Sequence, residues 1–256
     1  MDRDDQTIGH IVSRRAALRL LASGGLVAAG AARSARALAT SLATCVVRPA
    51  QTEGPYFVDE LLDRTDIRID PSDGSEKPGA ELNLAFNVSR LNGVDCEPLP
   101  GVVVDLWHCD HLGVYSDVAD PGFNTVGKKF LRGYQVADEE GVSRFITIVP
   151  GWYSGRTVHM HFKVRSEPTA SPGFEFTSQL YFDDSEIDAV HSFAPYTAKG
   201  QRTLRNAGDG IYGQGGSQLL VPLTPTDAGY AGVFDIALQN GVPVVPSTWS
   251  RTKLIR

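Results

Sequence analysis

The sequence lacks the features that mark several large classes of protein. Its most apolar stretch, residues 18–32, is too short and too often interrupted to serve as a permanent membrane anchor. It contains no internal repeat, no coiled-coil pattern, no glycine-rich phosphate loop and no serine-nucleophile elbow. Basic residues form no stripe beyond the N-terminus, and the formal net charge is −6, so nucleic acid is not an expected partner.

What is present has the composition of a globular protein. Of the 256 residues, 42% are hydrophobic and 21% are charged, which is enough for one large domain or two small ones. The 26 Gly and 15 Pro indicate many turns.

The first 39 residues resemble an export signal. SRRAAL at residues 13–18 is similar to a twin-arginine signal, and ALA at 37–39 offers a cleavage site before Thr40. A short amphipathic helix is the alternative. Cleavage would leave 18 basic and 27 acidic residues, a net charge of −9. We expect a soluble, acidic, exported protein (periplasmic or extracellular) with no membrane attachment in its mature form. Because twin-arginine export carries folded proteins, often with a cofactor inserted, a metal is also expected.

The three cysteines are Cys45, Cys96 and Cys109. In an exported protein one disulfide is expected, and one thiol is left over. Cys109 ends an apolar run and could be a small buried hydrophobe. We favour a Cys45–Cys96 disulfide.

The remainder predicts an all-β fold, an antiparallel β-sandwich core with an irregular N-terminal arm and long loops. Residues 40–78 show little periodicity and are interpreted as the arm, and residues 79–256 as the sandwich domain. The expected strands lie at 81–88, 102–109, 133–137, 142–149, 158–165, 179–182, 219–222 and 232–238. Residues 138–141 are expected to close a hairpin, and a short helix is expected over 185–191.

One of these strands, residues 158–165, alternates without a break. Its apolar residues fall on one side, and His159, His161, Lys163 and Arg165 fall on the other, which predicts a half-buried strand. Residues two apart on a strand project in the same direction, so the two imidazoles could share one metal ion. The alternative is a solvated polar face, with the histidines as exposed as Lys163 beside them.

Five segments between residues 51 and 182 carry more specific patterns. They are QTEGPYF at 51–57, WHCDHLGVYS at 107–116, FLRG at 130–133, PGWYSGRTVHMH at 150–161 and SQLYF at 178–182. In this order they resemble the signatures of the intradiol ring-cleavage dioxygenases, the family of protocatechuate 3,4-dioxygenase and catechol 1,2-dioxygenase. Five matches in the family's order are far more specific than any single one.

The resemblance implies one mononuclear, non-haem Fe(III) per chain, held by two tyrosines and two histidines. The corresponding residues here are Tyr115, Tyr153, His159 and His161. Tyr153 and His159 would be axial ligands, and Tyr115 and His161 equatorial ligands together with a hydroxide. Phenolate oxygen beside imidazole suits ferric iron. Outside this context, either tyrosine would be interpreted as a core or rim residue.

The resemblance also implies residues around the metal. Arg156 matches the family's active-site arginine, whose charge would stabilise carbanion character on the substrate ring; a surface turn is the alternative. Gln179 matches a pocket glutamine, with a polar residue on the outer face of a strand as the alternative. Pro55 and Tyr56 would line the substrate pocket or only pack the arm. His108 is interpreted as structural.

The implied activity is insertion of both atoms of O₂ into a catechol-type ring, with cleavage between the two hydroxylated carbons to a cis,cis-muconate-type diacid. The small aromatic substrate would bind as a chelating catecholate, and Tyr153 would leave the metal and accept a proton. One alternative is an exported phenolic- or carbohydrate-binding protein with a vestigial metal site, which predicts lost ligands. Another is an Fe(II) or copper oxygenase built on His159, His161 and Asp110, which would not need the tyrosines.

The sequence departs from the cytoplasmic catechol 1,2-dioxygenases. It carries an export signal, and no helical dimerisation segment precedes the core. It resembles the exported, single-domain branch of the family. The preferred catechol, and whether the chain forms a homo-oligomer, are left open.

Overall fold

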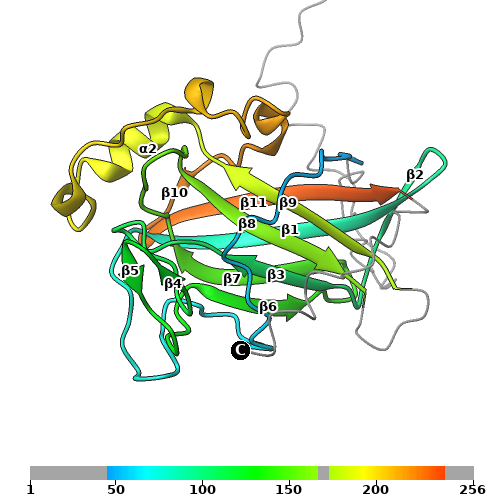
Figure 1. Cartoon of the computed structure of the whole chain (residues 1–256). Coiled ribbons are helices and arrows are strands. Elements are labelled where there is room, and N and C mark those ends of the chain that lie inside the picture. The colour runs from blue at the N-terminus through cyan, green and yellow to red at the C-terminus, as the bar shows by residue number, and fades with distance from the viewer. Residues whose placement is uncertain (1–44, 167–172, 240–256) are drawn as a thin grey trace, which may run out of the picture. The chain divides into compact units, whose positions relative to one another are not determined.

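The alternating segments of the sequence form the strands of two stacked β-sheets (Figure 1). The computed structural model describes residues 45–166 and 173–239. The expected export signal, residues 1–39, therefore lies outside the described residues, as do the start of the arm and the end of the sandwich domain. No helix among the described residues is long and apolar enough to cross a membrane.

The first sheet has four antiparallel strands in the order β6-β3-β8-β9. Their bounds are β6 (Arg132–Val136), β3 (Val103–Trp107), β8 (His159–Arg165) and β9 (Glu175–Tyr181). All five residues of β3 are buried. Its apolar run is therefore that of a central strand covered on both faces.

The second sheet has five strands, ordered β10-β11-β1-β2, with β7 also paired to β1. Their bounds are β10 (Thr224–Pro225), β11 (Gly229–Gln239), β1 (Glu81–Asn92), β2 (Asp95–Pro98) and β7 (Val142–Ile148). Strand β1 pairs in parallel with β11 and antiparallel with β2 and β7. Strand β10 pairs antiparallel with β11. The expected antiparallel sandwich thus contains one parallel pair, which is feasible because most of the domain lies between β1 and β11 in the chain.

The expected hairpin around residues 138–141 is wrong. The turn forms, because the Asp138 carboxylate accepts hydrogen bonds from the backbone of Glu140 and Val142. However, β6 before the turn pairs with β3, whereas β7 after it pairs with β1. The first of these strands therefore belongs to one sheet and the second to the other, so the turn connects the two layers.

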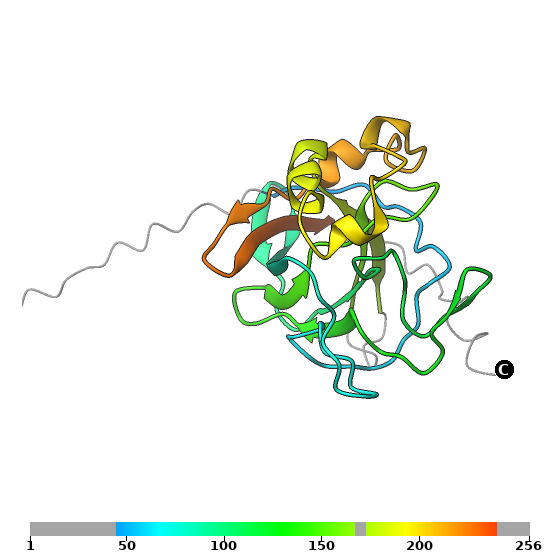
Figure 2. The same cartoon turned by 90° about the vertical axis from the view of Figure 1, so that its left-hand side faces the viewer.

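Short elements gather at one side of the sandwich, as both views show (Figures 1 and 2). They are α2 (Asp184–His191), with a capping box between Asp183 and Glu186, and the 3₁₀ helices η1 (Tyr196–Lys199), η2 (Asn206–Gly208) and η3 (Gly216–Leu219). A separate two-stranded hairpin pairs β4 (Ala119–Asp120) with β5 (Phe123–Asn124).

The expected strand at 219–222 is also wrong. Leu219 and Val221 are both buried, so the apolar alternation is real. Only Leu220 forms a bridge, with Tyr181, and the Val221 N–H donates to the Tyr181 carbonyl at 2.8 Å. The next N–H on that side, of Leu223, donates to the Glu186 side chain at 2.9 Å instead, so the ladder does not continue.

Four phenylalanines join the two sheets in the core. Phe86, Phe145 and Phe234 come from the second sheet, and Phe162 of β8 comes from the first. The Phe86 ring lies 5.3–6.0 Å from the other three, centroid to centroid. Burial of each side chain contributes about 1.5–3 kcal/mol. This cluster fixes how β8 sits on the second sheet.

The N-terminal arm crosses the outer face of β8 and β9, where it is coloured blue in Figure 1. A disulfide joins Cys45 at the start of the described arm to Cys96 on β2. Further along, the Gln51 N–H donates to the Thr177 carbonyl of β9 at 3.1 Å. Cys109 is free and buried. The disulfide closes a loop of 51 residues, for which chain entropy corresponds to about 2–4 kcal/mol.

The arm corrects one sequence interpretation of β8. A half-buried strand was expected, with its polar face toward solvent, but every residue from His159 to Val164 is buried. Lys163 is only 2% exposed and pairs with Glu53 of the arm at 2.6 Å and with Glu175 at 2.9 Å. Burial of a lysine requires such partners. The arm therefore covers the histidine-bearing face.

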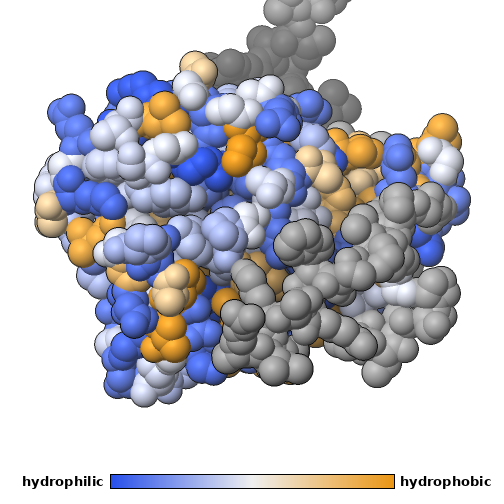
Figure 3. Space-filling model, viewed as in Figure 1, coloured by the Kyte–Doolittle hydropathy of each residue, from blue (hydrophilic) through white to orange (hydrophobic). Residues whose placement is uncertain are grey.

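The molecular face seen in Figure 3 is a mosaic of hydrophilic and hydrophobic residues rather than one apolar area. The most exposed large apolar side chains among the described residues, Leu61, Val94, Val126 and Phe193, lie on separate loops. Single exposed apolar residues of this kind are normal for folded proteins.

Candidate active site

The strand register brings the histidines next to particular partners. Across β3 and β8, Trp107 is opposite His161, and across β8 and β9, Gln179 is opposite His161. His159 is opposite Tyr181 in the same way. Directly opposed side chains share a face, so these residues form a row. The Trp107 and His161 rings stack, with centroids 5.2 Å apart and an interplanar angle of 11°.

The structure brings together the four residues that the sequence identified as metal ligands. The Nε2 atoms of His159 and His161 are 3.1 Å apart, and the Tyr153 hydroxyl lies 3.1 Å from the His159 Nε2. The Tyr115 ring packs edge-on against Tyr153 at 5.9 Å and is tilted against His161 at 6.2 Å. The Tyr115 hydroxyl is buried and makes no hydrogen bond of acceptable geometry.

Two loops carry the tyrosines, and Asp110 joins them. The Asp110 carboxylate accepts the N–H groups of Leu112 and Val114, which shapes the loop before Tyr115. Its backbone carbonyl accepts the Gly151 N–H at 3.1 Å, which ties this loop to the one that carries Tyr153. The Tyr115 and Tyr153 loops are therefore held against each other by main-chain contacts.

Burial sets the electrostatics of the four donor groups. Burial, with the Arg156 charge nearby, lowers the pKa of His159 to about 3, and burial with the neighbouring His159 lowers that of His161 well below its ordinary value. Both imidazoles are thus neutral. Burial raises the pKa of Tyr115 and Tyr153. A bound cation would reverse the effect on the phenols.

Arg156 lies beside these donors rather than on a surface turn. Its Nη1 is 3.3 Å from the His159 Nε2, and its Nη2 donates to the Gln179 Oε1 at 2.6 Å. Gln179 is fully buried, which excludes the alternative of an outer strand face, and its Nε2 donates to the Thr52 carbonyl of the arm at 2.8 Å. Arg156, Gln179 and the arm thus form one connected network.

Of the two expected pocket residues, Tyr56 is in direct contact with a donor residue. Its ring stacks on Tyr115 with centroids 4.5 Å apart, and its hydroxyl donates to Asp120 at 2.9 Å. Burial, together with that hydrogen bond, raises the pKa of Tyr56 to about 12. Gly54 lies so close to the His161 ring that a Cβ would be 3.1 Å from Cε1. Pro55, between them in sequence, is exposed.

Asp110 and His108 lie near the donor cluster in sequence, but their side chains bind other groups. The second carboxylate oxygen of Asp110 pairs with Lys77 at 2.9 Å, so all its strong contacts go to the loop and to a lysine. His108 is buried between the Cys109 carbonyl and the Thr147 hydroxyl, as a structural residue would be. Within residues 45–166 and 173–239, no three His, Cys, Asp or Glu residues form a group able to hold a metal.

The donor set nevertheless fits a metal ion. The His159 Nδ1 lies 2.7 Å from the Thr157 carbonyl, so it can donate there and leave the Nε2 lone pair facing His161 and Tyr153. Such backbone hydrogen bonds typically orient metal-bound histidines. A buried tyrosine hydroxyl without a partner is costly. A cation between Tyr115, Tyr153, His159 and His161 would satisfy it, and phenolate with imidazole suits ferric iron.

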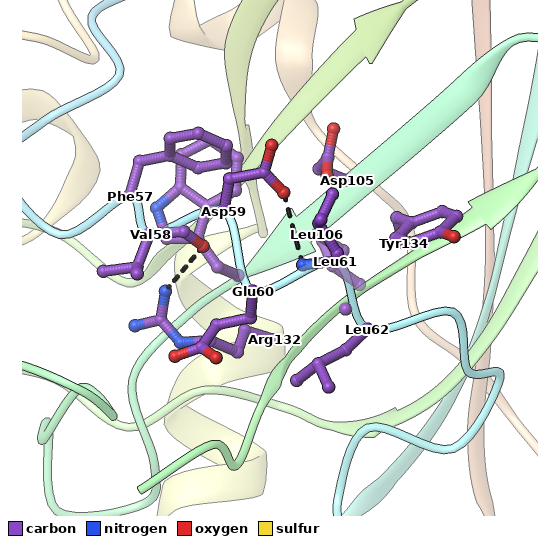
Figure 4. A pocket seen from close by; sticks show the side chains of 12 residues that line it. Phe57, Val58, Asp59, Glu60, Leu61, Leu62, Asp105, Leu106, Arg132 and Tyr134 are labelled. Atoms are coloured by element: carbon purple, nitrogen blue, oxygen red, sulfur yellow. Dashed lines mark hydrogen bonds between the residues drawn. The ribbon is translucent and has the colours of Figure 1, made fainter. Parts of the chain in front are cut away.

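A pocket in the described part of the chain lies elsewhere, between the arm and strands β3 and β6 (Figure 4). None of the four donor residues lines it. Val58, Asp59 and Arg132 lie around it in Figure 4. Trp107, which also lines this pocket, stacks on His161 of the donor cluster. We therefore place the candidate site at the donor cluster.

Comparison with known proteins decides the family. Residues 52–195 match a family model described as Dioxygenase. A solved structure of an intradiol ring-cleavage dioxygenase from Tetranychus urticae superposes with a TM-score of 0.65 at 28% identity, covering 76% of this chain and 95% of that one. The chain belongs to the intradiol ring-cleavage dioxygenase family. The matched range contains all four donor residues.

Other members of the family are also similar to the chain. The chain is 32% identical to catechol 1,2-dioxygenase 2 of Acinetobacter lwoffii over 157 residues, 53% of this chain and 51% of that protein. It is 31% identical to a chlorocatechol 1,2-dioxygenase of Pseudomonas putida over 165 residues, 56% and 58%. The chain thus spans about half the length of the curated relatives it matches. The dioxygenase domain of a carbohydrate-binding fusion protein from Streptomyces sp. SirexAA-E superposes with a TM-score of 0.51 at 28% identity, covering 75% of this chain and 98% of that one.

Sequence reasoning missed some residues of the candidate site. Asp209, Tyr181 and Lys163 each contact a residue of the site or of the arm that covers it. Tyr181 belongs to the matched SQLYF segment, so its neighbour Gln179 could have indicated it. Asp209 lies within the loop-rich segment after α2, where no periodic pattern singles out a residue.

Proposed function

We propose that this dioxygenase is an exported non-haem Fe(III) enzyme that cleaves a catechol-type ring between its two hydroxylated carbons with O₂. The observation that carries the proposal is the convergence of Tyr115, Tyr153, His159 and His161 on one buried point beside Arg156. The names of the catechol and chlorocatechol 1,2-dioxygenases that it resembles support the substrate class.

The residues can be given roles from their burial and contacts. When bound, Fe(III) would act as a Lewis acid for the two adjacent oxygens of a catecholate. Tyr153 is half-buried at the edge of the cluster, whereas Tyr115 is 1% exposed, so Tyr153 is the tyrosine placed to move aside and accept a catechol proton. The Arg156 cation would stabilise negative charge that develops on the ring.

The substrate pocket would be formed by the arm on one side of the donor cluster. Tyr56, stacked on Tyr115, would supply one wall, and Pro55 beside it would line the entrance. Gln179 would hold both Arg156 and the arm in place, because it contacts each of them. A substrate with two adjacent hydroxyls would supply both oxygens for Fe(III), and a monophenol would not.

The test is metal content, visible absorption and O₂ uptake. Protein produced with iron should contain one Fe per chain and be red to burgundy, because tyrosinate bound to Fe(III) absorbs in the visible. It should consume one O₂ per catechol and release a muconate-type diacid, while the mono-O-methylated catechol, as the matched control, gives no uptake. Zinc or copper at one equivalent in a colourless protein would overturn the iron assignment. Catechol binding without uptake would support a binding protein.

Export and the disulfide are tested together on the secreted protein. Mass spectrometry without reduction should find an N-terminus near Thr40 and a peptide that joins Cys45 to Cys96. Replacing both Arg14 and Arg15 by lysine should keep the precursor in the cytoplasm, because the twin-arginine pathway reads that pair. Normal export of the lysine variant would show that the signal has been misidentified.

A further inference from the structure

Asp209 is a buried carboxylate outside the segment that matches the family model, which ends at residue 195. Its side chain is 1% exposed and accepts four hydrogen bonds. One oxygen accepts the N–H groups of Ile211 at 2.7 Å and Tyr212 at 3.1 Å. The other accepts the Thr157 N–H and the Arg156 Nε–H, both at 2.8 Å.

These contacts hold the Arg156 guanidinium on two of its edges. Asp209 takes the Nε edge, and the Gln179 carbonyl oxygen takes Nη2 at 2.6 Å. The remaining nitrogen, Nη1, then faces the His159 Nε2 at 3.3 Å. Gln179 is neutral, so Asp209 is the anion that pairs with the guanidinium. Burial alone would raise the pKa of Asp209, but its backbone hydrogen bonds and Arg156 outweigh burial and hold that pKa below its ordinary value.

We propose that Asp209 is the positioning residue that aims the Arg156 guanidinium at the substrate ring. The role rests on the proposed function of Arg156. A charge-assisted pair at the Nε edge restricts a long, flexible side chain to one orientation. Without the carboxylate, the buried Arg156 guanidinium would also lose its anionic hydrogen-bond partner, which is costly for a buried charge.

The competing explanation is that Asp209 only shapes its loop, through Ile211, Tyr212 and Thr157. A matched control separates the two roles. Asn206 is a buried residue of the same segment, and it anchors that segment through the Thr157 hydroxyl at 2.7 Å and the Phe182 carbonyl at 2.8 Å. None of its hydrogen bonds goes to Arg156. Asn206→Ala should therefore lower stability without changing how Arg156 is held.

The kinetic test compares Asp209→Asn, Arg156→Gln and the double variant with Asn206→Ala, all loaded with iron. Asp209→Asn should lower kcat/KM by about 10–100-fold, the usual effect of removing a supporting partner at a metal site. In the Arg156→Gln background the same change should cost no more than about twofold, and Asn206→Ala should stay within about twofold of wild type. Effects of Asp209→Asn and Arg156→Gln that multiply independently would overturn the proposal.

Two readouts do not depend on turnover. Anaerobic titration with 4-nitrocatechol, followed by its visible spectrum, should show weaker binding in Asp209→Asn than in Asn206→Ala. In the metal-free protein, Asp209→Asn should lower the urea midpoint less in the Arg156→Gln background than in wild type, because the paired cation is already gone. If the midpoint shifts of Asp209→Asn and Arg156→Gln simply add in the double variant, the pairing is refuted, even if wild type proves inactive toward catechols. An inactive wild type with coupled midpoints would refute the proposed function alone.

Discussion

Replacing Tyr153 by phenylalanine is expected to leave iron bound and much of the visible colour in place, yet to lower turnover by about 10²–10⁴-fold, the range for loss of a general acid–base group. The variant removes only a hydroxyl from a half-buried ring, so the fold should be unaffected. The reason is the proposed role of Tyr153 as the ligand that moves aside and accepts a proton from the catechol.

Tyr115→Phe is the matched comparison, because it removes the same atom from the other tyrosine. Tyr115 is fully buried against Tyr56, Tyr153 and His161, and its hydroxyl has no alternative partner. This variant should therefore lose iron and shift the remaining visible band. Stopped-flow mixing with anaerobic catechol, iron analysis and O₂ uptake distinguish the two variants. Near-normal catechol binding and turnover in Tyr153→Phe would show that the leaving role belongs to another residue.

The second large effect is expected from Gly151→Ala. A Cβ at this position would overlap the backbone carbonyl of His111 and lie within 2.6 Å of that of Asp110. Backbone cannot move aside as a flexible side chain does, so the loops that carry Tyr115 and Tyr153 would be forced apart. We expect a loss of about 2–4 kcal/mol in unfolding free energy, at or above the usual cost of overpacking. Iron binding should fall as well.

The control for this prediction is Gly210→Ala. A Cβ on Gly210 would meet no atom within 4 Å, and the residue is exposed. Its unfolding free energy should stay within about 0.5 kcal/mol of wild type, as is usual for surface substitutions. Urea unfolding and iron analysis of both variants provide the measurement. If Gly151→Ala keeps wild-type stability and iron content, the close contact between the two loops is not required.

The candidate donors could be named from the sequence because their motifs are short. His159 and His161 are two residues apart on one strand, and each tyrosine stands in a distinctive segment, so local patterns identified all four. The expected helix over 185–191 could also be predicted, since Asp183 and Glu186 form a capping box within one turn. Signals confined to a few neighbouring residues do not depend on the rest of the fold.

The errors arose where the structure of a segment depends on contacts with a segment far away in the chain. Strand β6, before residues 138–141, pairs with β3, and strand β7, after them, pairs with β1. The turn was predicted correctly, but it does not close a hairpin. Lys163 was assigned to a solvated face because its alternation with apolar residues is that of a half-buried strand. Glu53, more than a hundred residues earlier, neutralises it and allows burial.

The sequence by itself determined the strands with strong alternation, the family signatures and the four candidate donors, because each depends on residue type and close spacing. The tertiary structure alone decided that the arm covers β8, that the two tyrosine loops touch at Gly151, and that Asp209 holds Arg156. These are contacts between segments far apart in the chain. Their free energy comes from burial and paired charges that exist only once both sheets have packed.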